Sequence, residues 1–231
     1  MKKTEVGDWS KVLSPIKAQE TISDQVYNSI LGSILSGQIG QGQHLVEQVL
    51  ADQLSVSRIS VREAIRRLAR DELVQIISNR GAFVVTFGVD DVEEIFNLRS
   101  ALEAIAIERV TSFASDQSLT VFDDILNEMV QYEKNQDRIR GAAADTNFHR
   151  KIMELSGQPR IFQVWERMSA QITVVLYNVS NYYPSYFGLA DRHVRIVELI
   201  RARDPQPAGE HLKDHIMEGA QRLLQAMRET S

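Results

Sequence analysis

The segment from Val56 to Arg70 constrains the fold of this 231-residue chain more than any other segment. It holds five arginines and a single acid, Glu63, although the formal net charge of the whole chain is −5. Three apolar residues recur at the spacing of one helix face: Ala64, Ile65 and Leu68. Three arginines recur every four residues and line another face: Arg62, Arg66 and Arg70. The pattern predicts a helix with an apolar back and a basic front.

The start of this predicted helix is suited to bind an anion. Ser57 or Ser60 can cap the first turn, where free backbone N–H groups and the helix dipole favour a phosphate. A short basic helix of this kind is what a recognition helix in the DNA major groove requires. The alternative is an ordinary helix with a solvated arginine face, since basic helices are common.

The flanking segments favour the DNA-binding alternative. Residues 45–54 carry leucines on one face and predict a preceding helix, separated from the basic helix by a short turn. Residues 73–77 and 82–87 are rich in β-branched and aromatic residues and predict two strands. Helix, turn, basic helix and β-hairpin make a winged helix-turn-helix. Arg80 and Gly81 lie at the predicted wing tip, where bare glycine backbone can approach a phosphate closely.

The composition excludes several classes of protein. The chain has 43% apolar and 25% charged residues, which is typical of a soluble globular protein. It has no apolar run near the ~18 residues of a membrane helix, and its start lacks the apolar core of a signal peptide. It contains no cysteine, which excludes disulfides and thiolate metal sites. We therefore expect a cytoplasmic protein.

Charge and chain breaks divide the sequence into three parts. Residues 1–21 are polar and are predicted to form a flexible arm, and residues 22–88 form the winged helix-turn-helix. Residues 89–231 form the remaining domain, with sixteen Lys/Arg against twenty-two Asp/Glu, whereas residues 1–88 have ten against nine. Basic charge is therefore concentrated in the predicted recognition helix, and the acidic part should face away from DNA.

The acidic part shows helical periodicity and no convincing strand pattern. Breaks rich in glycine or proline separate six predicted helices, at about residues 90–114, 117–138, 141–156, 159–180, 190–203 and 205–228. Six consecutive helices predict an all-α bundle, so the fold as a whole is mainly α with a small β-hairpin wing. The run from Ile172 to Tyr177 has strand propensity, but its helical neighbours favour a core helix.

A group of histidines in the predicted bundle is compatible with metal binding. Asp145 and His149 are four residues apart, so one helix face would present both as ligands of one ion. Further candidates are His193, His211 and His215. The alternative is a set of surface or packed histidines, because the Asp-x-x-x-His spacing alone is a weak signal.

The segment from Leu50 to Leu68 follows a long ungapped pattern, Leu-Ala-x-x-Leu-x-Val-Ser-Arg-x-x-Val-Arg-Glu-Ala-Ile-x-Arg-Leu. With this pattern, residues 22–87 resemble the GntR family of bacterial transcription regulators. The resemblance implies that operator contacts come from Ser57, Arg58, Ser60, Arg62 and Gly81. The charge pattern adds Arg66 on the helix and Arg80 on the wing.

Four positions depart from the pattern of that family. Ile59 and Ser60 stand where the family usually has Thr-Pro or a similar pair, a change that would alter which bases are read. Glu72 stands where the family usually has glycine and would place an acid near the wing. Gln48 stands where the family has a further DNA-contacting arginine.

The predicted bundle resembles the FCD domain of the FadR subfamily. The signature residues occur in order, as Arg99, Leu102 and Glu103, then Asp145, Phe148 and His149, then Arg192 and His193, then Asp204 and Ala208, then His215. The resemblance implies that Asp145, His149, His193 and His215 hold a divalent ion, with His211 as the alternative on the last helix.

This ligand set indicates which ion and which small molecule would bind. Nitrogen-rich ligation favours Zn or Ni, with Mn as a third option. Three neutral imidazoles and one carboxylate leave the site with net positive charge and open positions, which attract a carboxylate. Arg99 could bind a second carboxylate of that molecule, or it could form a salt bridge with Glu103.

These patterns together predict a homodimeric transcription factor and not an enzyme. The head would bind a palindromic double-stranded DNA operator, and a small organic acid in the bundle would control its affinity. Two alternatives remain open: a metal-dependent hydrolase-like enzyme, and a DNA-binding protein whose bundle only dimerises.

Overall fold

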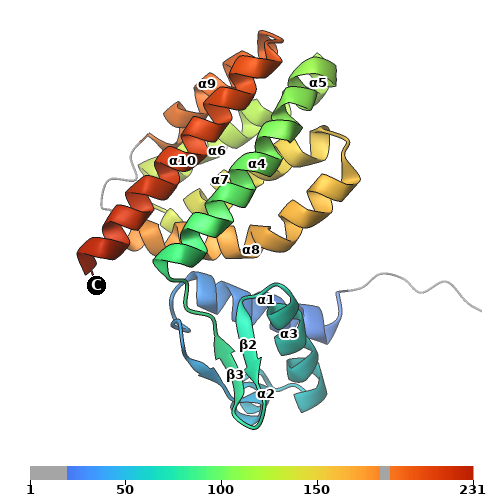
Figure 1. Cartoon of the computed structure of the whole chain (residues 1–231). Helices are drawn as coiled ribbons and strands as arrows, with labels where there is room; N and C mark the ends of the chain where they lie inside the picture. Colours follow the sequence, from blue (N-terminus) through green and yellow to red (C-terminus); the bar gives the residue numbers. More distant parts are fainter. Residues whose placement is uncertain (1–19, 183–187, 231) are drawn as a thin grey trace, which may run out of the picture.

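The structure, a computed structural model, describes residues 20–182 and 188–230, which form two parts (Figure 1). We call residues 20–88 the head and the described residues from 89 onward the bundle. Residues 1–19 of the predicted arm lie outside the described residues. Thr21 caps the first helix, because its side chain accepts a hydrogen bond from the backbone N–H of Asp24 at 3.1 Å.

The head contains three helices and a three-stranded antiparallel sheet. Its elements are α1 (Ile22–Leu35), β1 (His44–Leu45), α2 (Glu47–Leu54), α3 (Arg58–Arg70), β2 (Val74–Ile77) and β3 (Gly81–Val84). The strand order is β1-β3-β2. The predicted fold, mainly α with a small wing after the helix-turn-helix, is confirmed.

The strand β1 was not predicted from the sequence. Leu45, predicted as the first residue of a helix, lies opposite Ala82 in the sheet and is 3% exposed. It is extended because its side chain closes the core between the sheet and the helices. Helix α2 therefore begins two residues later than predicted, at Glu47.

The apolar back of α3 builds the core of the head. Val61, Ala64, Ile65 and Leu68 are buried along one side of the helix, and α3 packs on α1 through this side. The opposite side of α3 is exposed, because an apolar stripe that repeats every 3.6 residues covers only one face of a helix. That face carries Arg62 and Arg66, two of the predicted DNA-contacting residues.

The bundle is entirely helical over its described residues. Its helices are α4 (Val89–Phe113), α5 (Asp116–Leu119), α6 (Val121–Lys134), α7 (Arg138–Leu155), α8 (Pro159–Tyr182), α9 (Leu189–Arg201) and α10 (Pro205–Thr230). The single helix predicted for residues 117–138 is two helices that meet at Thr120. The run from Ile172 to Tyr177 is helical within α8, as predicted.

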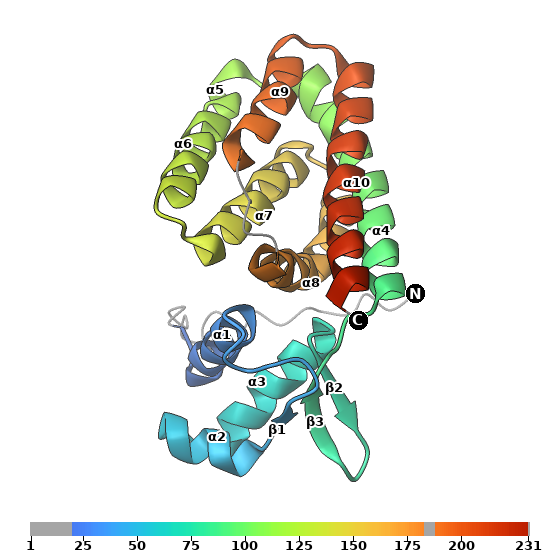
Figure 2. The ribbon, with the colours of Figure 1, turned by 90° about the vertical axis from the view of Figure 1, so that its left-hand side faces the viewer.

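The long helices α4 and α10, the first and last of the described bundle, lie side by side along its length (Figures 1 and 2). Helix α8 crosses the end of the bundle that faces the head, above α1 (Figure 2). No helix in the described part of the chain is both long and apolar enough to cross a lipid bilayer.

Among the described residues, hydrogen bonds from Gln171 and Tyr177 join α8 to the head. The side-chain amide of Gln171 donates to the carboxylate of Glu72 at 2.8 Å, and the Tyr177 hydroxyl donates to the Ser36 carbonyl at 3.2 Å. Glu72 has a φ of 55°, in the left-handed region that glycine adopts most easily. Glu72 lies two residues before the wing strand β2, and its carboxylate accepts its hydrogen bond from α8 of the bundle.

Candidate DNA-binding surface and metal centre

The start of α3 lies at the end of the head remote from the bundle (Figure 1). Ser57 is the N-cap: its hydroxyl oxygen accepts a hydrogen bond from the Ser60 backbone N–H at 3.1 Å. The two serine hydroxyls lie 2.9 Å apart. One of the two predicted capping residues therefore fixes the first turn, and both present hydroxyls beside the exposed helix end.

Four of the predicted DNA-contacting residues line one groove. The groove has a volume of about 540 Å³ between α2, α3 and the sheet, and its walls include Arg58, Arg62, Arg66 and Gly81. Gln48, at the position of the missing family arginine, also lines it. Arg80 extends from the turn before β3, with its guanidinium 6.0 Å from the ring of Phe83.

The groove also contains the carboxylate of Glu47, which was not predicted from the sequence. Glu47, the first residue of α2, accepts hydrogen bonds from the Arg62 Nε at 3.0 Å and the Arg62 Nη2 at 2.8 Å. The guanidinium of Arg58 lies 3.5 Å from the same carboxylate. The hydrogen bonds from Arg62 hold the pKa of Glu47 below its usual value. Glu47 therefore fixes the direction of Arg62 before any DNA arrives.

Gly81, the wing glycine, exposes its backbone as predicted. It also leaves room for the side chain of His44. Gly81 has a φ of 103°, and a Cβ at this position would collide with the imidazole of His44. His44 is itself stacked on Phe83, with ring centroids 4.6 Å apart. A side chain at position 81 would therefore displace the ring that supports the wing.

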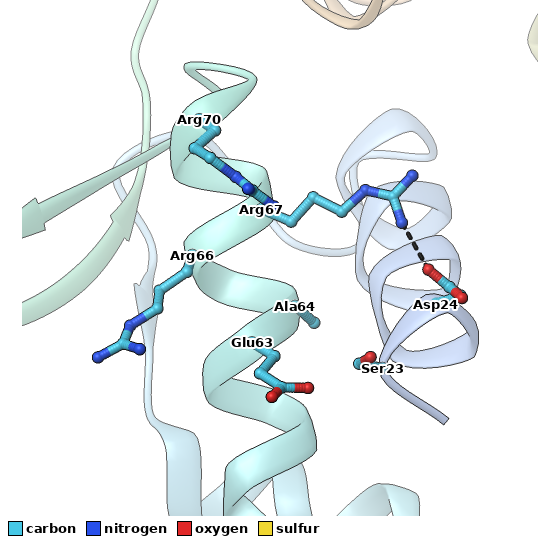
Figure 3. Close-up of a pocket in the computed structure, with 7 residues that line it drawn as sticks. All are labelled: Ser23, Asp24, Glu63, Ala64, Arg66, Arg67 and Arg70. Atoms are coloured by element: carbon cyan, nitrogen blue, oxygen red, sulfur yellow. Dashed lines mark hydrogen bonds and ion pairs between the residues drawn. The ribbon is translucent and has the colours of Figure 1, made fainter. Parts of the chain in front are cut away.

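The arginines of α3 extend from different sides of the helix. Figure 3 shows Arg67 reaching across to α1, where its Nη1 lies 2.6 Å from the Asp24 carboxylate, while Arg66 extends from the opposite side of α3. Arg66 and Arg70 line the pocket between α1 and α3 together with Arg67. Arg67 therefore joins two helices of the head, and Arg66 borders the groove beside the wing.

The four predicted metal ligands come together in the bundle. Asp145 and His149 on α7, His193 on α9 and His215 on α10 each offer one ligand atom, and these atoms all lie within 4.8 Å of one another. The Nε2 atoms of His149 and His193 are 3.4 Å apart, and His193 Nε2 is 3.3 Å from the Asp145 carboxylate. His211, the alternative, lies one turn earlier on α10 and is not part of this group.

The outer nitrogens of two of these rings have partners that set the tautomer. His149 Nδ1 lies 2.5 Å from the carboxylate of Glu103, and His193 Nδ1 lies 2.7 Å from the carbonyl of Leu189. Both partners are acceptors, so Nδ1 carries a proton on each ring and Nε2 of each ring faces the cluster. Two imidazole Nε2 atoms and a carboxylate thus converge on one point, an arrangement that a cation would stabilise.

Glu103 is the centre of a buried polar network that the sequence did not reveal. Its carboxylate accepts hydrogen bonds from Arg99 Nε at 2.9 Å and from Trp165 Nε1 at 2.7 Å, besides the contact with His149. Arg99 Nη2 also lies 3.4 Å from the Asp145 carboxylate. Of the two alternatives for Arg99, the salt bridge with Glu103 is present in the structure. The sequence signals for Glu103 were its place four residues after Arg99 and its place in the FCD signature.

The environment favours the protonation states that a metal requires. Burial alone would raise the pKa of Asp145, but His193, His149 and Arg99 hold it well below its usual value. Burial, together with the positive charge of Arg99, lowers the pKa of His149. Burial also holds the pKa of His215 well below its usual value. A charged carboxylate and neutral imidazoles are the forms that bind a divalent ion, so the residues present fit one.

Comparison with known proteins gives matches over both parts of the chain. Residues 22–84 match the family described as "Bacterial regulatory proteins, gntR family", and residues 94–218 match the "FCD domain". A probable D-xylose utilization operon transcriptional repressor of Paenarthrobacter nicotinovorans is 29% identical, over 85% of this chain and 86% of its own length. The gluconate operon transcriptional repressor of Bacillus licheniformis is 26% identical, over 74% and 72%.

Solved structures show the same fold. A transcriptional regulator described as GntR from Rhodococcus sp. RHA1 superposes with a TM-score of 0.75 at 23% identity, covering 88% of this chain and 97% of its own. The McbR/YncC protein of E. coli gives a TM-score of 0.74 at 20% identity, covering 91% and 98%.

Proposed function

Because the chain belongs to the GntR family of bacterial transcriptional regulators and carries an FCD domain, we propose that a small carboxylate at a metal centre controls its operator affinity. The regulators of this family bind DNA operators and small-molecule effectors. The observation that carries the finer proposal is the convergence of Asp145, His149, His193 and His215 on one point inside the effector domain.

The head supports DNA reading through the major groove. Helix α3 presents Arg58, Arg62 and Arg66 on an exposed face, and the wing presents Arg80 beside it. In a homodimer, two such helices would lie about one turn of DNA apart and would match the two halves of a palindromic operator. Arg62 is placed to reach a guanine, because Glu47 already holds its planar fork in one direction.

The bundle supports binding of a compact anion. Asp145, His149, His193 and His215 would hold a divalent ion, for which their nitrogen-rich set favours Zn or Ni. When bound, that ion supplies positive charge with open positions, which attract a carboxylate. Glu103 and Leu189 keep two of the imidazoles turned toward the ion by accepting their Nδ1 protons.

Arg99 is the proposed second contact for the effector. Its guanidinium already contacts the carboxylates of Glu103 and Asp145, so an arriving carboxylate would share it with these groups. Two relatives are repressors of D-xylose and gluconate operons by name. We therefore expect a small sugar acid, hydroxy acid or dicarboxylate. Binding that favours one arrangement of the two heads would change operator affinity by the difference in binding free energy.

The test measures metal content and ligand binding on the full-length protein. The protein is stripped with chelator, reloaded with Zn or Ni, and analysed for stoichiometric metal. A library of small carboxylates is then screened by thermal shift, with and without metal. We expect at least one carboxylate to raise the melting temperature only in the metal-loaded protein. We also expect the same compound to change affinity for the operator.

Arg99→Lys is the matched variant, because it keeps the buried positive charge but loses the planar fork. We expect it to bind metal normally and to lose most of the ligand-induced shift. A carboxylate screen without any shift on metal-loaded protein would contradict the effector proposal. Turnover of a compound, in place of stabilisation, would favour the enzyme alternative.

A further inference from the structure

An exposed isoleucine stands at the start of α3. Ile59 is the second residue of the helix, directly after Arg58, and 69% of it is exposed. It is the most exposed large apolar residue of the described head. A single apolar residue on an ordinary surface needs no explanation. The position of Ile59 is different, because it lies within the face that carries the DNA-contacting side chains.

The helical period places Ile59 in line with the arginines. It is three residues before Arg62 and seven before Arg66, so the three side chains share one face of α3. The buried face, centred on Ala64 and Leu68, lies on the opposite side. Ile59 therefore contributes nothing to the core of the head, and its methyl groups project from the face that bears Arg62 and Arg66.

We infer that Ile59 is a specificity-determining residue that reads a thymine in each half of the operator. The inference rests on the proposed DNA binding of α3. Among the four bases, only thymine presents a methyl group in the major groove, and apolar side chains recognise it by contact. In this inference, the guanidinium of Arg62 donates hydrogen bonds to the polar edge of a base, whereas Ile59 excludes water from the thymine methyl group. The pair would specify neighbouring bases by two different kinds of contact.

The expected size of this contact follows from the methyl group alone. Removing one buried methyl costs about fourfold in affinity per contact. Uracil differs from thymine only by that methyl and keeps its hydrogen-bonding edge. Replacing the contacted thymine by uracil therefore isolates the apolar contact from every polar contact at the same base pair.

The experiment selects binding sites from a random duplex DNA pool with the full-length protein. Each thymine of the selected site is then replaced by uracil, one position at a time, and binding is measured. We expect one thymine per half-site at which uracil weakens wild-type binding about fourfold. Ile59→Ala, whose side chain is three carbons shorter, should lose most of the difference between the thymine and uracil duplexes, and Ile59→Val should keep most of it.

The control is Ile139→Ala, the same substitution at a 44% exposed residue of α7 in the bundle. It should retain the wild-type preference for thymine over uracil. If the pool yields an enriched site but no uracil position separates wild type from Ile59→Ala, the inference about Ile59 is wrong and the DNA-binding proposal stands. If no sequence is enriched and no duplex is bound, the DNA-binding proposal fails, and the inference fails with it.

Discussion

The head and the bundle hold their candidate functional residues in opposite ways. In the head, these side chains are mostly exposed, and most come from the short stretch between Ser57 and Arg66. In the bundle, the candidate ligands are buried or half-buried and come from three helices between Asp145 and His215. Charges at an exposed site interact weakly with the rest of the protein, whereas buried charges depend on every partner. Substitutions should therefore change binding in the head and stability in the bundle.

Among the substitutions considered, Glu103→Ala should cause the largest loss of stability. The substitution removes the carboxylate that accepts from Arg99 Nε, from the His149 Nδ1–H and from the Trp165 indole N–H, while Arg99 keeps its contact with Asp145. Loss of one partner of a buried ion pair costs about 3–5 kcal/mol in the free energy of unfolding. Chemical denaturation of the full-length protein measures it.

The control for Glu103→Ala is Glu198→Ala. Glu198 pairs with Arg195 at 2.9 Å, but both side chains are more than half exposed. The loss should be below ~1 kcal/mol. Equal losses for the two variants would contradict the contrast between a buried and an exposed network.

Removal of the proposed metal ion should cause the next largest loss of stability. An ion that binds only the folded protein stabilises it by about 2.7 kcal/mol when its free concentration is 100 times its Kd. Chelator should therefore lower the melting temperature of the wild type. His193→Ala should remove most of that sensitivity, whereas His211→Ala, outside the cluster, should keep it. A chelator response that survives His193→Ala would place the ion elsewhere.

Arg62→Ala tests the head through DNA binding, whereas the preceding substitutions test the bundle through stability. We expect a loss of ~1–3 kcal/mol in binding of the cognate operator and little loss on random DNA. Stability should hardly change, because the Arg62 side chain is 47% exposed and its pair with Glu47 lies at the surface. Equal losses on both DNAs would show that Arg62 contacts phosphate.

Arg80→Gln should show the phosphate behaviour. We expect weaker binding to all sequences and a salt dependence that is flatter by about one unit in the log–log slope. Titrations at several salt concentrations measure both quantities. An effect confined to the cognate operator would instead assign Arg80 to base reading.

The smallest effect concerns the contact between the two regions. Gln171→Ala should cost about 1 kcal/mol, because it removes the hydrogen bond to Glu72. Glu72→Gly loses the same bond but relieves a left-handed backbone that costs a non-glycine residue about 1–2 kcal/mol. Its net change should be close to zero. A large loss in Glu72→Gly would show that this contact contributes more stability than one ordinary hydrogen bond.

The sequence predicted the head better than the bundle's interior because the signals in the head are local. The basic face of α3 and the Ser57 cap follow from spacings within a few residues. The two-residue β1 has no period of its own and forms only by pairing with β3. The Glu47–Arg62 pair joins two helices across a turn, so no spacing within one helix predicts it.

The candidate metal site could be predicted from residue spacing only in part. Asp145 and His149 share a helix face, and their spacing alone suggested two ligands. Residue patterns could not show that His193 and His215 meet them, and the resemblance to a known domain supplied that expectation. The hydrogen bond from Trp165 to Glu103 joins side chains 62 positions apart and had no signal in the sequence.

The pairing of α4 with α10 has a consequence for how the protein is made. A ribosome adds roughly 5–20 residues per second, so α10 emerges on the order of ten seconds after α4. The head closes its core from neighbouring segments and can fold during that interval. The side of α4 that packs on α10 stays uncovered until α10 arrives with His215. A newly made chain therefore passes through a stage in which the head is complete and the bundle still exposes apolar surface.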